Sequence, residues 1–265
     1  MTLAYDRLGL PGATAVVLLH GIGGGRHIWA DMLPALAAAG CDAIAVDLPG
    51  YGNSAAMAPG GVHLMAQSVL NLLDRLDLRQ AVFVGHSMGG MVAQELAATA
   101  APRVAGLVLA CTSPAFGRPD GDWQARFVQE RLAPLDAGQG MDALAAQLVP
   151  DMVGPGTPDR ARQQARMVMA AVPEATYRRV LAALVAFDRR AALPGIHVPT
   201  LCLAGEHDRV APPEVLRRMA QRIPGAGFEV LPGAGHVANV EQPQAFQAAV
   251  VDFLRRHAFL TLEVP

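Results

Sequence analysis

One serine of this chain lies in a glycine pattern that is typical of a nucleophile. Residues 85–89 read Gly85-His86-Ser87-Met88-Gly89, which is G-x-S-x-G. The apolar run 81–84 precedes the motif and a segment with helical periodicity follows it, which is the strand–turn–helix context in which this pattern carries chemistry. The turn is so sharp that a side chain two positions before or after the serine would collide with it, so glycine is needed at both places. The pattern therefore predicts that the hydroxyl of Ser87 attacks a carbonyl group.

A serine hydroxyl needs a base, and His236 is the histidine that is best placed among the eight in the chain. It follows the last predicted strand, 228–231, and precedes the last predicted helix. In a parallel sheet that position is at the carboxyl edge, the same edge as Ser87. Gly233 and Gly235 allow the loop to bend inward. His207, which also follows a strand, is the only serious rival as the base.

The acid that orients the base is expected after another strand at the same edge, between the nucleophile and the histidine in chain order. Asp208, in the segment 204–210, fits that position, and Glu206 is the alternative. The segment 110–113, which follows the preceding sheet strand, holds no carboxylate. Asp47 also ends a strand, but it precedes the serine in the chain and is expected to be a structural turn residue.

Two backbone N–H groups are needed to stabilise the oxyanion that forms when serine attacks. One is expected from Met88, directly after the nucleophile, and the other from Ile22, in the glycine-rich loop 20–25 after the first buried strand. That loop does not fit a dinucleotide-binding G-x-G-x-x-G pattern, because counting from Gly21 places Arg26 where the third glycine should be. We therefore expect no cofactor.

Short apolar runs alternate with helical segments along most of the chain. Continuous apolar runs of this kind are typical of parallel strands that are covered by helices on both faces. The sequence thus predicts an α/β fold with a doubly wound, mostly parallel sheet. The predicted strands are 3–8 at the edge, 15–19, 43–46, 81–84, 106–109, 200–203 and 228–231, and the predicted helices are 29–39, 64–76, 88–100, 213–222 and 242–257.

The alternation stops between about Thr112 and Pro194. Helical segments around 123–132, 141–148, 160–171 and 177–186 are separated there by proline and glycine, and none of them resembles a sheet strand. We interpret this stretch as an inserted helical cap. The expected division is a core of residues 1–112 and 195–265 and a cap of residues 113–194.

Composition excludes several classes of function. The net charge of −2 gives no electrostatic reason to expect nucleic acid or an anionic membrane as partner. The chain has no lysine, which excludes Schiff-base and pyridoxal-phosphate enzymes. Cys41, Cys111 and Cys202 lie far apart with no C-x-x-C spacing, so we expect buried thiols and neither a metal site nor a disulfide framework.

The N-terminal residues do not form a basic region followed by an apolar run, so no signal peptide is expected. No apolar stretch approaches the roughly 18 residues of a membrane-spanning helix. We therefore expect a cytoplasmic protein. The sequence leaves the oligomeric state open.

Together, the motifs resemble those of the cap-bearing α/β-hydrolase fold family nearly from end to end. The similarity is carried by residues 20–24, 47–54, 85–90, 205–208 and 235–236, and it is closest to the branch that contains 3-oxoadipate enol-lactonases, small carboxylesterases and C–C hydrolases of meta-cleavage products. The resemblance implies a sheet of about eight strands and a Ser–His–Asp triad. The C–C hydrolases often carry asparagine before the serine, where this chain has His86.

The function that follows is a serine hydrolase that cleaves a small-molecule carboxylic ester or lactone through an acyl-enzyme. The alternatives are a C–C bond hydrolase, a perhydrolase, and a non-catalytic protein of the same fold that only binds a ligand. Trp29, Trp123 and Phe127, and also Phe116, are candidates to line an apolar pocket. Arg118, Arg126 and Arg131 are candidates to bind a substrate carboxylate, although solvated arginines are the commoner case. Met167 and Met169 are expected to be helix packing.

Overall fold

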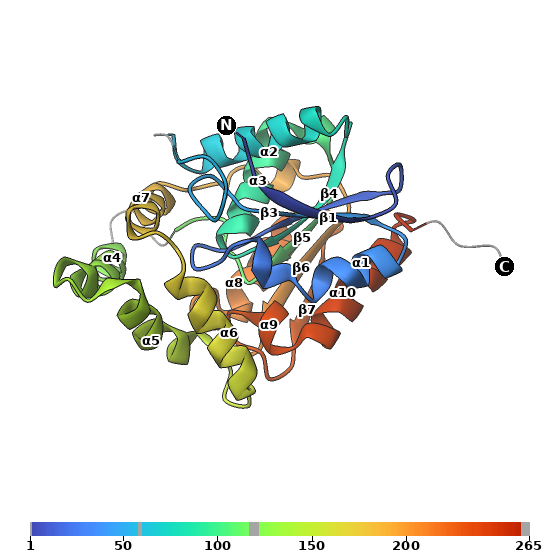
Figure 1. The fold of residues 1–265 in the computed structure, drawn as a ribbon. Helices are drawn as coiled ribbons and strands as arrows, with labels where there is room; N and C mark the ends of the chain where they lie inside the picture. The colour runs from blue at the N-terminus through green and yellow to red at the C-terminus, as the bar shows by residue number, and fades with distance from the viewer. Residues whose placement is uncertain (1, 58–59, 117–121, 261–265) are drawn as a thin grey trace.

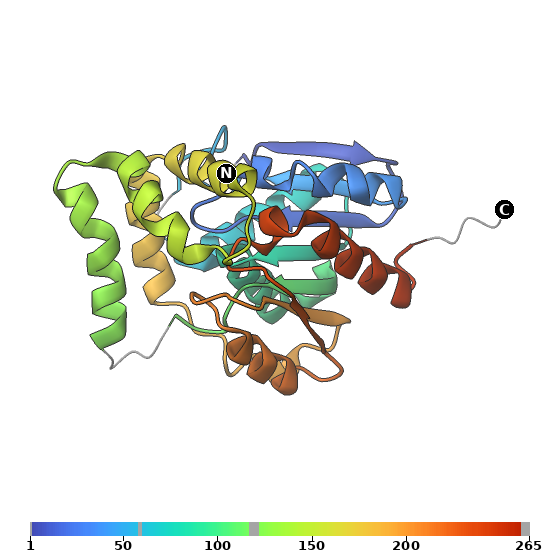
Figure 2. The same cartoon turned by 90° about the horizontal axis from the view of Figure 1, so that it is seen from below.

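The computed structural model describes residues 2–57, 60–116 and 122–260. These residues form a sheet with helices on both faces and a group of helices at one end (Figures 1 and 2). The seven strands are β1 Tyr5–Gly9, β2 Ala15–Leu19, β3 Asp42–Val46, β4 Ala81–His86, β5 Val104–Ala110, β6 Thr200–Gly205 and β7 Gly227–Leu231. Their order in the sheet is β1-β3-β2-β4-β5-β6-β7.

The sheet is parallel except for its first strand, because β1 pairs with β3 in the antiparallel sense and all other neighbours are parallel. This confirms the predicted mostly parallel sheet. The described residues form seven strands where about eight are expected. The chain leaves β2 toward β3 on one side and resumes with β4 on the other, which makes the β2–β4 boundary a topological switch point. Such points are where α/β sheets place their ligand sites, beyond the carboxyl ends of the strands.

Two hydrophobic cores lie on the two faces of the sheet, because side chains alternate along each strand. The helices around the sheet are α1 Met32–Ala38, α2 Gly61–Arg75, α3 Met88–Thr99, α8 Pro213–Arg222, α9 Ala238–Glu241 and α10 Pro243–Arg256. Val17 and Leu19 of β2 belong to the core under α2, α3 and α8, whereas Val16 and Leu18 belong to the core under α1 and α10.

The helix predicted for 29–39 is in fact two pieces. A short 3₁₀ turn spans Arg26–Trp29, and α1 begins only at Met32. Pro34 lies in the first turn of α1, where its missing N–H costs nothing. A helix that began at Trp29 would put this proline in the interior and lose a backbone hydrogen bond, which explains the later start.

Among the described residues between β5 and β6 are four α-helices: α4 Asp122–Asp136, α5 Gly140–Met152, α6 Asp159–Ala170 and α7 Glu174–Val185. We call them the helical insertion. Figure 2 shows the insertion at one end of the sheet, away from the end of α10. It occupies the stretch in which the sequence predicts helices and no sheet strand, and its division from the core as a separate domain stays a prediction.

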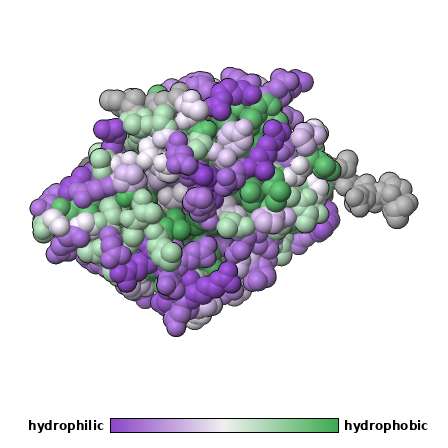
Figure 3. Space-filling model, viewed as in Figure 1, coloured by the Kyte–Doolittle hydropathy of each residue, from purple (hydrophilic) through white to green (hydrophobic). Residues whose placement is uncertain are grey.

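The surface in Figure 3 is mainly hydrophilic, with apolar areas between the polar ones. Within the ranges that the structure describes, none of the helices has both the length and the apolar character that crossing a membrane requires.

Candidate active site

Ser87 stands on the sharp turn between β4 and α3. Its backbone has φ 53° and ψ −117°, a conformation that costs energy for a residue with a side chain. A Cβ on Gly85 would lie 2.4 Å from the carbonyl oxygen of Gly89, and a Cβ on Gly89 would lie 2.1 Å from that of Leu19. Both glycines are therefore required sterically, as the sequence predicts.

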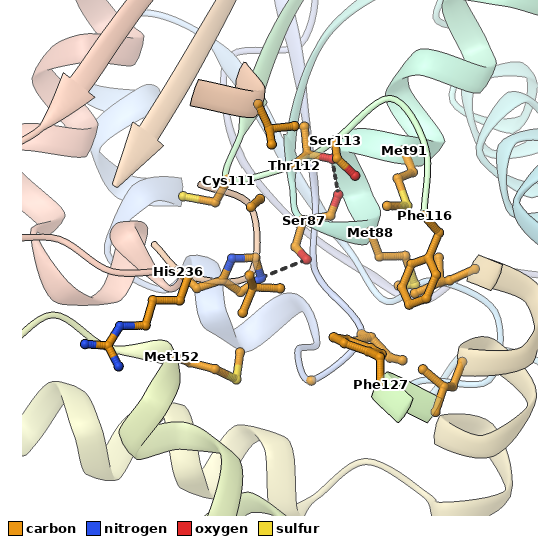
Figure 4. Close-up of a pocket in the computed structure, with 18 of the residues that line it drawn as sticks. Ser87, Met88, Met91, Cys111, Thr112, Ser113, Phe116, Phe127, Met152 and His236 are labelled. Carbon is orange, nitrogen blue, oxygen red and sulfur yellow. Dashed lines mark hydrogen bonds between the residues drawn. The ribbon is translucent and has the colours of Figure 1, made fainter. Parts of the chain in front are cut away.

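Three side chains from three different strand ends meet at this turn. The Nε2 atom of His236 lies 3.0 Å from Oγ of Ser87, and the Nδ1 atom lies 2.9 Å from Oδ2 of Asp208. Figure 4 shows the hydroxyl of Ser87 directed at the imidazole of His236. His236 and Asp208 are each only 3% exposed. The structure thus brings together the three residues that the sequence analysis selects.

The environment of Asp208 fixes which nitrogen of His236 carries the proton. Oδ1 of Asp208 accepts the backbone N–H groups of Val210 and Ala211, at 2.8 and 2.9 Å, so these donors stabilise an ionised carboxylate. A carboxylate only accepts, so Nδ1–H of His236 must donate to it. Nε2 is then free to accept the hydroxyl proton of Ser87, which is the arrangement that nucleophilic catalysis by serine needs.

Glu206 and His207, the alternatives for the acid and the base, lie away from Ser87. The carboxylate of Glu206 accepts the N–H of Gly233, and the side chains of Glu206 and His207 are 53% and 42% exposed and lie near each other. Neither lines the cavity that contains Ser87. The structure therefore separates Asp208 and His236 from both alternatives.

His86, beside Ser87, supports the loop of His236 through a hydrogen bond. Its Nε2–H donates to the carbonyl oxygen of His236 at 2.7 Å. Burial and, to a lesser extent, the nearby His236 lower the pKa of His86 to about 3, so the ring of His86 is neutral at ordinary pH. His86 therefore helps to hold the loop of His236 in place, and its low pKa makes it a poor base.

The expected oxyanion donors, Ile22 and Met88, both line the cavity next to Ser87. In the described part of the chain, neither N–H donates to another group. The hydroxyl of Tyr51 donates to the carbonyl oxygen of Ile22 at 2.9 Å, which orients the peptide groups of the loop. His20 also holds this loop, because its Nε2 accepts the N–H of Leu48 at 3.0 Å.

Asp47 has the structural role that the sequence predicts. Its side chain is buried, accepts the N–H of Arg26 at 2.8 Å and forms an ion pair with the Arg26 guanidinium. It also accepts the N–H of Asn53. These contacts anchor the segment that follows the loop 20–25, which we call the oxyanion loop because it contains the expected donor Ile22. They leave Asp47 without a contact to His236.

A cavity of about 460 Å³ opens from Ser87 toward the helical insertion. Trp123 and Phe127 of α4 line it together with Phe116, and their rings pack against one another with centroids 5.0–5.6 Å apart. Figure 4 shows Phe116 and Phe127 across the cavity from His236. Trp123 and Phe127 are thus located where a substrate-binding role requires them.

Trp29 does not line the cavity. Its side chain is fully buried 6.0 Å from the ring of Phe246, in the core under α1 and α10, and it is absent from the cavity lining. The expectation that Trp29 lines the pocket is therefore wrong. The sequence locates Trp29 near the site loop but does not reveal to which face of the sheet its side chain turns.

The three candidate arginines differ in position. Arg131 lines the cavity with its guanidinium carbon 3.3 Å above the ring of Phe127. Arg126 does not line the cavity, and Arg118 lies outside the described residues. Met169 lines the cavity as well, although helix packing alone is expected for it, whereas Met167 is 64% exposed.

Within the described residues, no group of three or more His, Cys, Asp or Glu side chains could hold a metal ion. Cys41, Cys111 and Cys202 are buried free thiols, as expected. Cys111 lines the cavity, but burial raises the pKa of its thiol well above the ordinary value, which disfavours the reactive thiolate.

Sequence reasoning missed three residues that hold the site together: Tyr51, Thr112 and Glu241. Tyr51 orients the oxyanion loop, and the hydroxyl of Thr112 donates to the carbonyl oxygen of Ser87 at 2.7 Å (Figure 4). Glu241 contacts the backbone on both sides of His236. No local pattern marks these roles, because the partners of Tyr51 and Thr112 are distant in the chain and Glu241 resembles an ordinary acidic residue near a helix end.

The protein combines a mostly parallel sheet and a helical insertion with a serine at a strained strand-to-helix turn. These features define the class of hydrolases that are built on an α/β sheet. The sequence profile described as alpha/beta hydrolase fold matches residues 14–243, so the chain belongs to this family.

Named relatives cover nearly the whole chain. A protein from Variovorax paradoxus (strain S110), named as a candidate carbamate hydrolase RutD, is 34% identical over 97% of both chains. The pimeloyl-[acyl-carrier protein] methyl ester esterase of Pectobacterium atrosepticum is 33% identical over 91% of this chain and 94% of its own. The crystal structure of the enol-lactonase from Burkholderia xenovorans LB400 is 32% identical, covers 96% of both chains and has a TM-score of 0.85.

Proposed function

We propose that this protein hydrolyses a small carboxylic ester or lactone through an acyl-enzyme formed on Ser87. The observation that carries the proposal is the 3.0 Å contact between Oγ of Ser87 and Nε2 of His236, both of which line a cavity of about 460 Å³. A serine hydroxyl is a weak nucleophile unless an adjacent base removes its proton. Here the base is in contact with the hydroxyl, and Asp208 holds it in the tautomer that can accept the proton.

In the first half of the reaction, Oγ of Ser87 attacks the carbonyl carbon while its proton passes to Nε2 of His236. The backbone N–H groups of Ile22 and Met88 donate to the oxyanion that forms, and Asp208 stabilises the imidazolium. The carbon–oxygen bond to the alcohol then breaks, and the proton on Nε2 goes to the leaving oxygen. Losing one oxyanion donor typically costs about 3–4 kcal/mol of transition-state stabilisation.

In the second half, water takes the place of the alcohol. Nε2 of His236 removes a proton from this water as its oxygen attacks the acyl carbon of the ester on Ser87. The tetrahedral oxyanion again receives the N–H groups of Ile22 and Met88. Collapse breaks the bond to Oγ, the proton returns to Ser87, and a carboxylic acid leaves. In a lactone the alcohol and the acid remain one molecule.

The cavity lining indicates which substrates to test. Aromatic side chains of α4 and the thioethers of Met88, Met91 and Met169 make it mainly apolar, which suits an aliphatic or aromatic acyl group. Three arginines, Arg131, Arg190 and Arg209, add cationic groups to the wall, which favours a substrate that also carries an anionic or carbonyl group. The names of the relatives add carbamates, methyl esters and enol lactones to the candidates.

The test is a panel of p-nitrophenyl esters, methyl esters, lactones, carbamates and vinylogous 1,5-diketones, assayed with the wild type and with Ser87→Ala. We expect ester or lactone turnover, and we expect its loss by at least about 10³-fold in Ser87→Ala. Ser68→Ala is the matched control, because Ser68 is also buried but belongs to α2 and bonds only to Leu64 of its own helix. Ser68→Ala is expected to keep wild-type turnover.

Other outcomes point elsewhere. Turnover of the diketones alone would indicate C–C bond hydrolysis, and turnover that needs added peroxide would indicate a perhydrolase. Binding of esters without turnover would indicate a ligand-binding protein. An acyl group attached to Ser87, detected by mass spectrometry after a rapid quench, would support the acyl-enzyme directly. Wild-type esterase activity in Ser87→Ala would refute the proposal.

A further inference from the structure

The last residue of α9, Glu241, carries a carboxylate that is buried next to the loop of His236. The residue is 3% exposed and, within the described ranges, forms no ion pair. Its two oxygens instead accept hydrogen bonds from four donors: the N–H groups of Gly154, Gly235 and Val237 and the hydroxyl of Thr157. A buried charge needs such an arrangement, because it has lost its hydration.

The donors come from two segments that are about 80 residues apart in the chain. Gly235 and Val237 flank His236, at 3.0 and 3.1 Å from the carboxylate. Gly154 and Thr157, at 2.6 and 2.5 Å, belong to the connection between α5 and α6 of the helical insertion. Glu241 therefore bonds to the His236 loop and to the insertion at the same time.

The two segments also contact each other directly. The N–H of His236 donates to the carbonyl oxygen of Met152, the last residue of α5, at 2.6 Å. A Cβ on Gly235 would lie 2.5 Å from that same oxygen, and a Cβ on Gly154 would lie 2.1 Å from the carbonyl oxygen of Gly233. Backbone packs on backbone here, so the segments cannot shift against each other without breaking these hydrogen bonds.

From this geometry we propose that Glu241 is a positioning residue, which fixes the imidazole of His236 by clamping its loop onto the 153–157 connection of the helical insertion. The proposal rests on the proposed function, since it gives His236 the role of base. Glu241 touches neither Ser87 nor the cavity. It acts through the backbone N–H groups on either side of His236, and it links the placement of the base to that of the insertion.

Glutamine at position 241 tests the chemistry of the clamp without changing its size. The amide oxygen can serve one pair of donors, but the amide nitrogen accepts nothing and brings two further N–H groups toward the others. The loop must then move away from the connection. A displacement of about 1 Å at a catalytic group lowers turnover by up to about 10²-fold, so we expect kcat of Glu241→Gln to fall by about 10- to 100-fold.

The value of KM distinguishes a positioning role of Glu241 from damage to the substrate cavity. Because Glu241 does not line the cavity, KM of Glu241→Gln is expected to stay within about threefold of the wild type. Thr157→Val removes only one donor and keeps the shape of the side chain, so a smaller fall in kcat, of about 2- to 10-fold, is expected. Glu206→Gln is the matched control, because Glu206 also binds this loop, at Gly233, but is exposed and does not flank His236.

A proton NMR signal gives a readout that does not depend on turnover. The Nδ1 proton of His236, shared with Asp208 at 2.9 Å, is expected to resonate far downfield, and its loss in Asp208→Asn assigns it. We expect this signal to shift or broaden in Glu241→Gln and Thr157→Val and to remain unchanged in Glu206→Gln. Thermal unfolding of each variant shows whether it is folded.

Two results would overturn the proposal. One is wild-type kcat and an unchanged proton signal in a folded Glu241→Gln. The other is a fall in the unfolding temperature of Glu241→Gln with no effect of Thr157→Val on kcat or on the signal, which would make the cluster a merely structural support. If Glu241→Gln does not fold, Thr157→Val decides. Failure of the proposed function would instead appear as wild-type turnover in Ser87→Ala, with the His236 signal still sensitive to position 241.

Discussion

Replacing Asp208 by asparagine should disable the base while leaving its position intact. Among the residues that the structure describes, two backbone N–H groups donate to Oδ1 of Asp208 and one group, Nδ1–H of His236, donates to Oδ2. An asparagine at this position has a single acceptor oxygen, which will stay with the two backbone donors. In the opposite orientation the oxygen would accept one hydrogen bond in place of two, a loss of about 1 kcal/mol, and the NH₂ group would face the two backbone N–H donors. Its NH₂ group then faces Nδ1 of His236.

The consequence is the wrong tautomer. A donor that faces Nδ1 requires that atom to accept, so the imidazole proton moves to Nε2, which can no longer take the proton of Ser87. The structure around Asp208 thus predicts a loss of kcat of about 10⁴-fold, equivalent to about 5.4 kcal/mol of transition-state stabilisation. The fold should survive, because the two backbone hydrogen bonds at 2.8 and 2.9 Å are retained.

The assay is kcat on the best substrate of the panel, together with the ¹⁵N shifts of the His236 ring, which distinguish a proton on Nδ1 from one on Nε2. Glu206→Gln is the matched control, since Glu206 is a carboxylate only two residues away that does not contact His236. It should retain kcat within about twofold, the range of surface substitutions. If Asp208→Asn kept kcat within tenfold of the wild type, or kept its proton on Nδ1, the tautomer argument would be refuted.

Two further perturbations test other parts of the site and fold. Tyr51→Phe removes the donor to the carbonyl oxygen of Ile22 and should lower kcat/KM about 5- to 13-fold, in line with about 1–1.5 kcal/mol for a hydrogen bond. An unchanged kcat/KM would show that the loop needs no such support. Burial opposes ionisation of Glu95, but hydrogen bonds from Arg189 and His63 outweigh it and bring its pKa below 4.5. Since the pKa of Glu95 is lower in the folded than in the unfolded protein, the ionised carboxylate stabilises the fold above pH 4.5. This stabilisation is lost as the pH falls through the pKa of the folded state. Glu95→Gln should therefore weaken the dependence of the unfolding free energy on pH below 4.5, as measured by urea unfolding, and an identical dependence would contradict this assignment.

The sequence predicts the positions of Ser87, Asp208 and His236 because each follows a parallel strand. In such a sheet, chain order and strand direction fix the edge at which a strand ends, and short loops leave a side chain little freedom to lie elsewhere. The order of the strands places β4 beside β2, which brings the turn of Ser87 next to the oxyanion loop. The residues most open to prediction are therefore those that topology alone locates.

Residues whose place depends on packing are harder to predict, as Trp29 and Glu241 show. Trp29 follows the oxyanion loop by only a few residues, yet its ring packs against Phe246 of α10, some 200 residues later in the chain. Glu241 resembles an ordinary acidic residue near a helix end, and its burial is explained only when the 153–157 connection approaches from the insertion. No local pattern records that approach.

Trp123 and Phe127 show how far pattern can reach. Both lie on α4, whose existence is clear from its periodicity, and their spacing of four places them on one face of the helix. Periodicity cannot say whether that face covers the cavity or the solvent, because the helical insertion has no strand direction to orient it. The contact between Met152 and His236 supplies part of the missing constraint, since it ties the end of α5 to the loop of the base. The sheet therefore positions Ser87, Asp208 and His236, whereas the packing of the insertion decides which side chains line the cavity beside them.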